Sequence, residues 1–291
     1  MKSKKIIKIA QNIIKLFLFF SVPFLFAVDW PQSAQTPENF AVDFARPCGG
    51  MFSTGLIFAE QGSVKASDTA TILLTITDSD NLSMFDSPLG NSLIAVSEEN
   101  LMNIYGNLDE IKIKATEKVI IEGEEIATSG RTGWQKEEWG LEFKVADIQS
   151  RTVINPLVLL PRIIETKVPL LYNISLVNKK GTTYNLNQTK ALPAGTYSLY
   201  FEGYDTQPPF KAAVSINGKE SEIITYNILK KTGRSLSVDG KRNYPFNVIF
   251  PDKKKQLLAT TSLTKGKALL VIQTFDLNGN EKSMSYTFEV Y

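Results

Sequence analysis

Apolar and polar side chains alternate along most of this chain after residue 27, and a period of two is typical of β-strands rather than helices. Strands are expected at residues 69–78, 91–98, 111–130 and 140–147. One helical turn is expected in NPLVLLP, where Pro156 suits a first helical position and Pro161 ends the turn. The pattern therefore predicts an all-β protein.

From about residue 165 the alternating runs become longer and are separated by turn sequences. These are NKKGTT, INGKES, VDGKRN and LNGNEK, at residues 178–183, 216–221, 238–243 and 277–282. Asn-Gly and Asp-Gly pairs supply the positive φ angles that tight hairpins need. Regularly spaced strands of this kind predict a β-sandwich over residues 165–291, with a first β domain over residues 28–164.

The N-terminus has a lysine-rich start followed by an apolar run from Ile13 to Ala27. This order is typical of a secretory signal peptide at residues 1–27, with cleavage expected after Ala27. An uncleaved membrane anchor is the alternative, and any membrane contact is expected through this leader alone. The predicted location is a bacterial periplasm or cell envelope.

The chain of 291 residues contains no histidine, and Cys48 is its one cysteine. Imidazole is the commonest zinc ligand and the commonest general base near neutral pH, so every mechanism that requires it is excluded. A single thiol makes neither an internal disulfide nor a thiolate metal cluster, and Cys48 is expected to be buried and inert. The formal net charge of +2 gives no indication of nucleic-acid binding.

Residues 50–161 contain a series of short sequence segments in a defined order. These are GGMFSTGLIFAEQGSVKAS, LGNSLIAVSEENLMNIYGNLDEIKIKATEKVIIEGEEIATSGRTG, WGLEFKVAD and INPLVLLP. In order and spacing the series resembles the catalytic domain of the lysostaphin or LytM-type zinc peptidases, which cut peptidoglycan cross-bridges. The resemblance implies a LytM-like β domain of the duplicated hybrid motif type. More weakly, LPAGTYSLYFEGYDTQ at residues 192–207 resembles the Ig-like β-sandwich that follows such domains in some envelope proteins.

The chemical residues of that family are missing from the matching positions. Its zinc-binding His and Asp fall on Ser53 and Ile57, its third zinc ligand falls on Glu142, and its two auxiliary histidines fall on Asn107 and Gly140. Catalytic zinc needs three protein ligands and an open fourth position. We therefore expect no metal, no cofactor and no catalytic residue here, with Glu142 as a partly exposed strand residue.

Other catalytic arrangements find little support in the sequence. Ser262 to Lys265 reads SLTK but lies in a predicted strand and turn, and Glu124–Glu125 and Glu137–Glu138 are neighbours whose side chains point opposite ways in a strand. Acidic clusters at 78–81 and 276–280 look like calcium loops, yet they sit where hairpin turns are expected and lack the glutamate that completes an EF-hand.

A peptidase-like groove that has lost its metal is still able to bind a ligand. Tyr105, Trp134 and Trp139 are candidates to line it, because aromatic faces stack on sugar rings or peptide, although Trp139 folded into the vacated pocket would close it instead. Degenerate members of the resembled family regulate cell-wall amidases through protein contacts. The sequence thus predicts an exported, non-catalytic pseudopeptidase that binds peptidoglycan or a cell-wall hydrolase or other envelope protein.

Two alternatives stay open at this stage. An unrelated structural or adhesin-like protein with two β domains would not place the FSTGLI and GLEF strands side by side. A cryptic cell-wall hydrolase that uses carboxylates alone would depend on residues such as Glu142 or Asp147.

Overall fold

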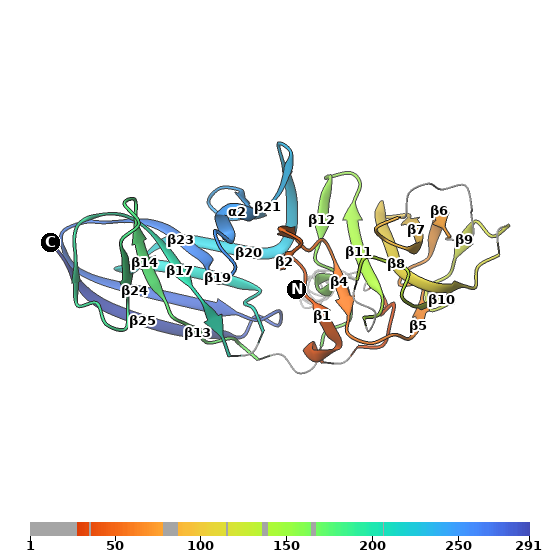
Figure 1. The fold of residues 1–291 in the computed structure, drawn as a ribbon, viewed down its shortest axis with the longest axis horizontal. Helices are drawn as coiled ribbons and strands as arrows, with labels where there is room; N and C mark the ends of the chain where they lie inside the picture. Colours follow the sequence, from red (N-terminus) through yellow and green to blue (C-terminus); the bar gives the residue numbers. More distant parts are fainter. Residues whose placement is uncertain are drawn as a thin grey trace, which may run out of the picture.

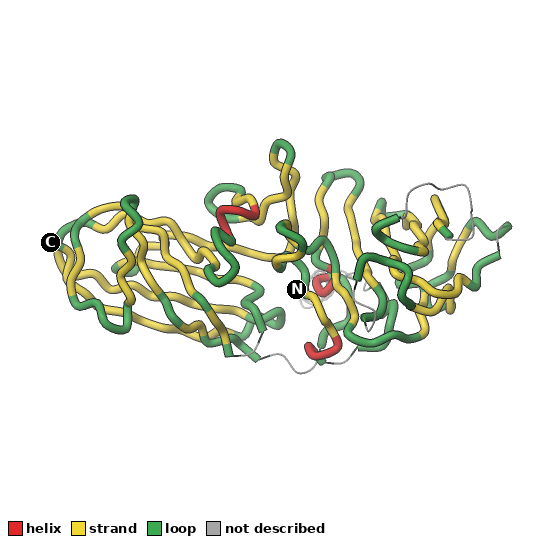
Figure 2. Tube along the Cα trace, viewed as in Figure 1, coloured by secondary structure: helices red, strands yellow, loops and turns green. Residues whose placement is uncertain are grey.

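A computed structural model describes residues 28–34, 36–77, 87–114, 116–135, 139–163, 167–205 and 207–291. The molecule is elongated, with a first β region at one end and a second at the other (Figure 1). Strands dominate the trace, and the helical segments of the described residues are short: the 3-10 turns η1 (Pro37–Asn39) and η2 (Pro156–Val158) and the helix α2 (Phe246–Ile249) (Figure 2). The all-β prediction is confirmed, as is the helical turn at Pro156.

The first region is built on a mixed set of short and long strands around one core. Its strands are β1 (Phe40–Val42), β2 (Pro47–Cys48), β3 (Met51–Phe52), β4 (Leu56–Phe58), β5 (Ser63–Lys65), β6 (Ala70–Ile76), β7 (Asn91–Ser97), β8 (Leu101–Ile111), β9 (Val119–Ile120), β10 (Glu125–Ser129), β11 (Glu142–Asp147) and β12 (Thr152–Ile154). Pairing runs β1–β4–β11–β8–β7–β6–β9, and β10 pairs with both β5 and β8.

Three of the four strands expected in this region form where the alternation places them, as β6, β7 and β11. The fourth, expected over residues 111–130, is divided by a turn between β9 and β10, in which Gly123 adopts a φ of 80°. The alternation did not indicate β8 over its full length, because five of its residues are buried on both faces where the strand crosses the middle of the sheet.

The second region is a sandwich of two sheets over its own apolar core. Its strands are β13 (Leu171–Tyr172), β14 (Ser175–Asn178), β15 (Thr183–Asn185), β16 (Ala191–Leu192), β17 (Gly195–Phe201), β18 (Gly203–Tyr204), β19 (Lys211–Ile216), β20 (Lys219–Thr232), β21 (Ser235–Asp239), β22 (Tyr244–Pro245), β23 (Gln256–Leu263), β24 (Gly266–Phe275) and β25 (Glu281–Val290). One sheet is β15–β14–β17–β23 and the other includes β16–β25–β24–β19–β20.

All four turn sequences predicted for this region connect paired or successive strands, namely β14 to β15, β19 to β20, β21 to β22 and β24 to β25. In the second turn Asn217 and Gly218 have φ angles of 49° and 76°, as a tight hairpin with Asn-Gly at its tip requires. The hairpin predictions are therefore confirmed.

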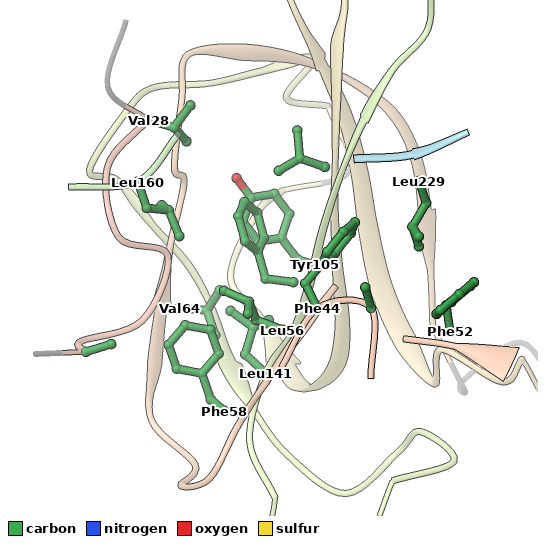
Figure 3. Packing of buried hydrophobic residues seen from close by; sticks show 14 of the residues in the cluster. Val28, Phe44, Phe52, Leu56, Phe58, Val64, Tyr105, Leu141, Leu160 and Leu229 are labelled. Atoms are coloured by element: carbon green, nitrogen blue, oxygen red, sulfur yellow. The ribbon is translucent and has the colours of Figure 1, made fainter. Parts of the chain in front are cut away.

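The two regions share backbone pairing and a core. The long strand β20 leaves the sandwich and pairs with β12, with Leu229 opposite Val153. Leu229 is fully buried among apolar side chains of the first region, including Phe52, and Figure 3 shows both at one side of that cluster. The first region thus completes its sheet with a strand supplied from beyond residue 165.

The predicted leader, residues 1–27, lies outside the described residues. Within the described residues no helix has the length and apolar character needed to cross a membrane.

Candidate functional site

The strands that carry the FSTGLI and GLEF sequences lie side by side. In β11, Glu142 stands opposite Ile57 of β4 on one side and opposite Gly106 of β8 on the other. Asn107 follows Gly106 in β8, so positions far apart in the sequence meet in three adjacent strands. The resemblance assigns Ser53, Ile57, Asn107, Gly140 and Glu142 to one former metal site, and Ile57, Asn107 and Glu142 lie on these three adjacent strands.

Glu142 is buried, with 4% of the residue exposed, which corrects the expectation of a partly exposed residue. Its Oε1 atom lies 2.7 Å from the Lys144 ammonium. Its Oε2 atom accepts hydrogen bonds from the Trp134 indole at 3.0 Å and from the Gln135 amide. A buried carboxylate is tolerated when a cation and hydrogen-bond donors compensate it, and here both oxygens are used.

Ile57 and Ser53 are fixed in ways that give no reactive group to the site. Ile57 is 1% exposed and carries only hydrocarbon next to Glu142. Ser53 is 7% exposed, and its hydroxyl donates to the Gly55 carbonyl at 2.9 Å. The backbone of Ser53 exchanges hydrogen bonds with Ala45 and Arg46, so this serine belongs to a tight loop.

Asn107 ties together the loops around the site. It adopts a positive φ of 58° and is 1% exposed. Its Nδ2 atom donates to the Gly140 carbonyl at 2.9 Å and its Oδ1 atom accepts from the Gly133 N–H at 2.9 Å. An amide side chain supplies both the donor and the acceptor that these two backbone segments need.

Gly140 lies where the backbone leaves no room for a side chain. A Cβ atom at this position would be 1.8 Å from the Glu60 carbonyl oxygen, and the Gly140 N–H donates to the Phe58 carbonyl at 2.9 Å. The chain segment before β11 therefore packs directly on the segment after β4, and no imidazole fits at residue 140 in this backbone.

The three aromatic binding candidates lie in different surroundings. Tyr105 is fully buried, its hydroxyl contacts the Ser67 hydroxyl at 2.7 Å, and its ring points into the core (Figure 3). Tyr105 therefore does not line a groove, and burial raises its pKa to about 12. Trp134 is 48% exposed although its indole binds Glu142, whereas Trp139 is half-buried and its carbonyl accepts from Asn107.

Lys144 and Gln135 belong to the site and were not among the predicted residues. Lys144 follows Glu142 by two residues in a strand, so both side chains project from one face, and this spacing was a readable signal. Gln135 comes from the loop before β11 and has no such signal. Cys48 lies near Glu142 as well. It is partly exposed, not buried as the sequence predicted. The partial burial of its thiol, followed by the charge of Glu142, raises the pKa of that thiol.

The remaining sequence candidates have structural roles. Glu124 accepts the Ile121 N–H, whereas Glu125 pairs with the Lys112 ammonium, so these two neighbours have separate partners. Asp276 accepts both the N–H and the side-chain amide of Asn280, which is turn chemistry. Ser262 to Lys265 spans the end of β23 and the turn before β24. The clusters at 78–81 and 137–138 lie outside the described residues. Within the described residues, no group of three or more His, Cys, Asp or Glu side chains is arranged to hold a metal ion.

Comparisons with known proteins find remote similarity. A protein-family model matches residues 168–291, and a search of curated proteins finds no match. Among solved structures, the SpoIIQ–SpoIIIAH pore-forming complex matches with 16% identity over 48% of this chain and 94% of that chain, at a TM-score of 0.36. The catalytic domain of the prophage-encoded protein EnpA from Enterococcus faecalis matches with 19% identity over 43% and 93%, at 0.34. Lysostaphin matches with 15% identity over 87% and 99%, also at 0.34.

Proposed function

We propose that this chain is an exported, non-catalytic protein of the bacterial cell envelope, related to the LytM-type peptidases, that binds peptidoglycan or a cell-wall hydrolase. The observation that carries the proposal is the environment of Glu142. It lies between β4 and β8 at the position that the resemblance assigns to a metal ligand, yet its carboxylate is neutralised by Lys144 and bound by Trp134.

The donor chemistry of the site argues against hydrolysis by a zinc-bound water. Such a metal needs three nitrogen, sulfur or oxygen ligands, and the three matching positions supply a serine hydroxyl held by Gly55, a hydrocarbon at Ile57 and one carboxylate. A cation at Glu142 would also have to displace the Lys144 ammonium, which lies 2.7 Å away. Purified protein is expected to contain far less than one zinc per chain and to leave cross-bridges uncut.

Trp134 gives the site a means to bind without cutting. Its indole N–H is anchored on Glu142 at 3.0 Å, while 48% of its surface stays exposed. An aromatic ring held at one edge and open on its face suits stacking on a sugar ring or an extended peptide. This arrangement supports a binding role for the site.

The structural or adhesin-like alternative is less well supported, because β4 and β11 are adjacent with Ile57 opposite Glu142. For the carboxylate-only hydrolase, Asp147 is an unsuitable acid or base. It caps a turn, with hydrogen bonds from the Gln149 N–H, the Ser150 N–H and the Ser150 hydroxyl.

The test is retention of the mature protein, residues 28–291, on purified peptidoglycan sacculi, followed by mass spectrometry of proteins captured from an envelope extract. The variants are Trp134→Ala and Trp139→Ala, and Tyr172→Ala, an aromatic of the second region with 45% exposure, is the matched control. Retention that Trp134→Ala abolishes and Tyr172→Ala preserves supports a wall-binding site.

Loss of hydrolase capture in Trp134→Ala, with no retention on bare sacculi, supports a protein-docking site instead. Equimolar zinc by elemental analysis, or release of cross-bridge fragments that Glu142→Gln abolishes, would contradict the proposal. So would full retention and full capture by both tryptophan variants.

A further inference from the structure

A groove of about 390 Å³ lies where the two regions meet, apart from the Glu142 site. The first region contributes Arg46 to its wall, and the second contributes Tyr204, Phe250 and the lysines Lys253, Lys254 and Lys255. Its volume lies in the range of small-molecule sites.

Arg46 places a positive charge inside the junction without a matching ion pair. Its Nη1 atom donates to Gln256 at 3.0 Å, its Nη2 atom donates to the Pro209 carbonyl at 3.3 Å, and its guanidinium lies 5.1 Å from the centre of the Tyr226 ring. These partners are all uncharged. Among the described residues, no carboxylate lies within ion-pair distance of Arg46, and its buried Nε atom has no hydrogen-bond acceptor.

Such an arrangement is costly unless something compensates the charge. Burial lowers the pKa of Arg46, and electrostatic interactions with Tyr226, Tyr204 and Asp43 act in the opposite direction. Asp43 is the one carboxylate among these three groups, and burial raises its own pKa. A guanidinium that has no ion pair is the type of group that recognises an oxyanion.

The lysines extend the positive charge to the mouth of the groove. Asp252 accepts the N–H groups of Lys254 and Lys255 at 2.8 and 2.9 Å, which fixes the turn that carries them. Lys255 lies 3.9 Å from the Asp252 carboxylate, whereas Lys253 and Lys254 are exposed and form no ion pair among the described residues. Among the described residues, the wall contains one acidic residue, Glu202, and four cationic ones.

We propose that this groove binds a small organic oxyanion, a carboxylate or a phosphate on an aromatic or apolar body. Arg46 binds the anionic group, Lys253 and Lys254 attract it, and Tyr204, which is 40% exposed, contacts the body of the ligand together with Phe250. The site is independent of the proposed role of Glu142 and Trp134.

The probes for the test are phenyl phosphate and phenylacetate, with benzyl alcohol as the uncharged probe, in calorimetric titrations of the full chain at low and high salt. The double variant Lys253→Ala/Lys254→Ala removes charge at the groove. Lys179→Ala/Lys180→Ala is its matched control, because this pair is also exposed and also occupies a turn held by a side-chain oxygen, that of Asn178.

We expect at least one of the two anions to bind, with affinity about tenfold lower in Lys253→Ala/Lys254→Ala and within about twofold of wild type in Lys179→Ala/Lys180→Ala. High salt weakens the binding, and benzyl alcohol does not bind. The relative affinity of the two anions tells a phosphate site from a carboxylate site. Arg46→Met is expected to abolish binding, provided that its circular dichroism spectrum matches that of wild type.

Failure of both anions to bind at millimolar concentration would overturn the proposal, as would an equal loss of affinity in the two double-lysine variants. Binding of benzyl alcohol as tight as that of the anions would also overturn it. Because the lysine pairs are exposed, these outcomes do not depend on how Arg46→Met folds.

Discussion

Among the residues that the structure describes, each region buries one glutamate, and the two carboxylates are compensated differently. Glu142 of the first region is 4% exposed and relies on the side chains of Lys144, Trp134 and Gln135. Glu222 of the second region is 1% exposed and makes no ion pair among the described residues.

The carboxylate of Glu222 is held by neutral donors instead. It accepts the Lys241 N–H at 2.7 Å, the Ile223 N–H at 3.2 Å and the Tyr244 hydroxyl. Burial of a carboxylate is thus not in itself a mark of a functional site. What distinguishes Glu142 is that its partners are all side-chain groups, and one of them, Trp134, is half-exposed and open to contact by a ligand.

The largest expected effect concerns the glycines beside the two glutamates. In Gly140→Ala the new Cβ atom would lie 1.8 Å from the Glu60 carbonyl oxygen. Because this oxygen belongs to the backbone, it has little freedom to move away. We therefore expect a loss of about 3 kcal/mol or more in the free energy of unfolding. In Gly240→Ala the nearest atom is Tyr244 Cε2 at 2.8 Å, the far part of a side chain, and about 1 kcal/mol is expected.

Urea unfolding of the two glycine variants measures this difference. Equal losses would show that the packing of residue 140 on Glu60 is no tighter than that of residue 240 on Tyr244.

The second effect tests the dependence of Glu142 on a cation. Lys144→Met leaves the buried carboxylate without its counter-charge, and we expect a loss of about 3 kcal/mol, since removal of one partner of a buried pair is strongly destabilising. Lys241→Met is the control: Glu222 contacts only the backbone N–H of Lys241, so a loss below about 0.5 kcal/mol is expected.

The double variant Glu142→Gln/Lys144→Met is expected to recover most of the lost stability, because the uncompensated charge is gone. If the double variant is as unstable as Lys144→Met in the same denaturation experiment, packing of the lysine stem rather than charge explains the result.

The third effect compares the aromatic donors. Tyr244→Phe removes a buried hydroxyl that donates to Glu222, with an expected loss of about 2 kcal/mol. Trp134→Phe removes the indole N–H, but Trp134 is 48% exposed and water replaces the donor, so a loss below about 1 kcal/mol is expected. A larger loss for Trp134→Phe in thermal unfolding would mean that this tryptophan stabilises the first region rather than serving as a contact for ligands.

Most of the strands and the hairpin turns could be predicted from the sequence. The Asn217–Gly218 turn forms because its residues tolerate positive φ angles. The adjacency of Ile57 and Glu142 was expected from the resemblance that the order of the sequence segments suggested. The pairing of β12 with β20 could not be predicted, because local periodicity contains no information on which strands meet. For the same reason Gln135 and the burial of Tyr105 were not foreseen.

The smallest effect is a difference in how the two regions respond to alkaline pH. Burial, then the hydrogen bond and charge of Glu222, raise the pKa of Tyr244 from its ordinary value of 10.0 to about 12. The stability that Tyr244 contributes is complete below pH 10, where it is protonated folded or unfolded, and is lost as pH rises toward 12. In the first region, Tyr105 also has a pKa of about 12, and burial is again the main cause, whereas its hydrogen bonds with Ser67 lower it.

Glu222→Gln removes one cause of the shift at Tyr244 and none at Tyr105. Stability of this variant is therefore expected to fall less steeply between pH 10 and 12 than that of wild type, whereas Glu142→Gln is expected to keep the wild-type slope. Urea unfolding at a series of alkaline pH values, with tyrosinate absorbance recorded alongside, measures both slopes. Identical slopes in the two variants would mean that the negative charge of Glu222 does not contribute to the pKa of Tyr244, and that its carboxylate acts there only as a hydrogen-bond acceptor.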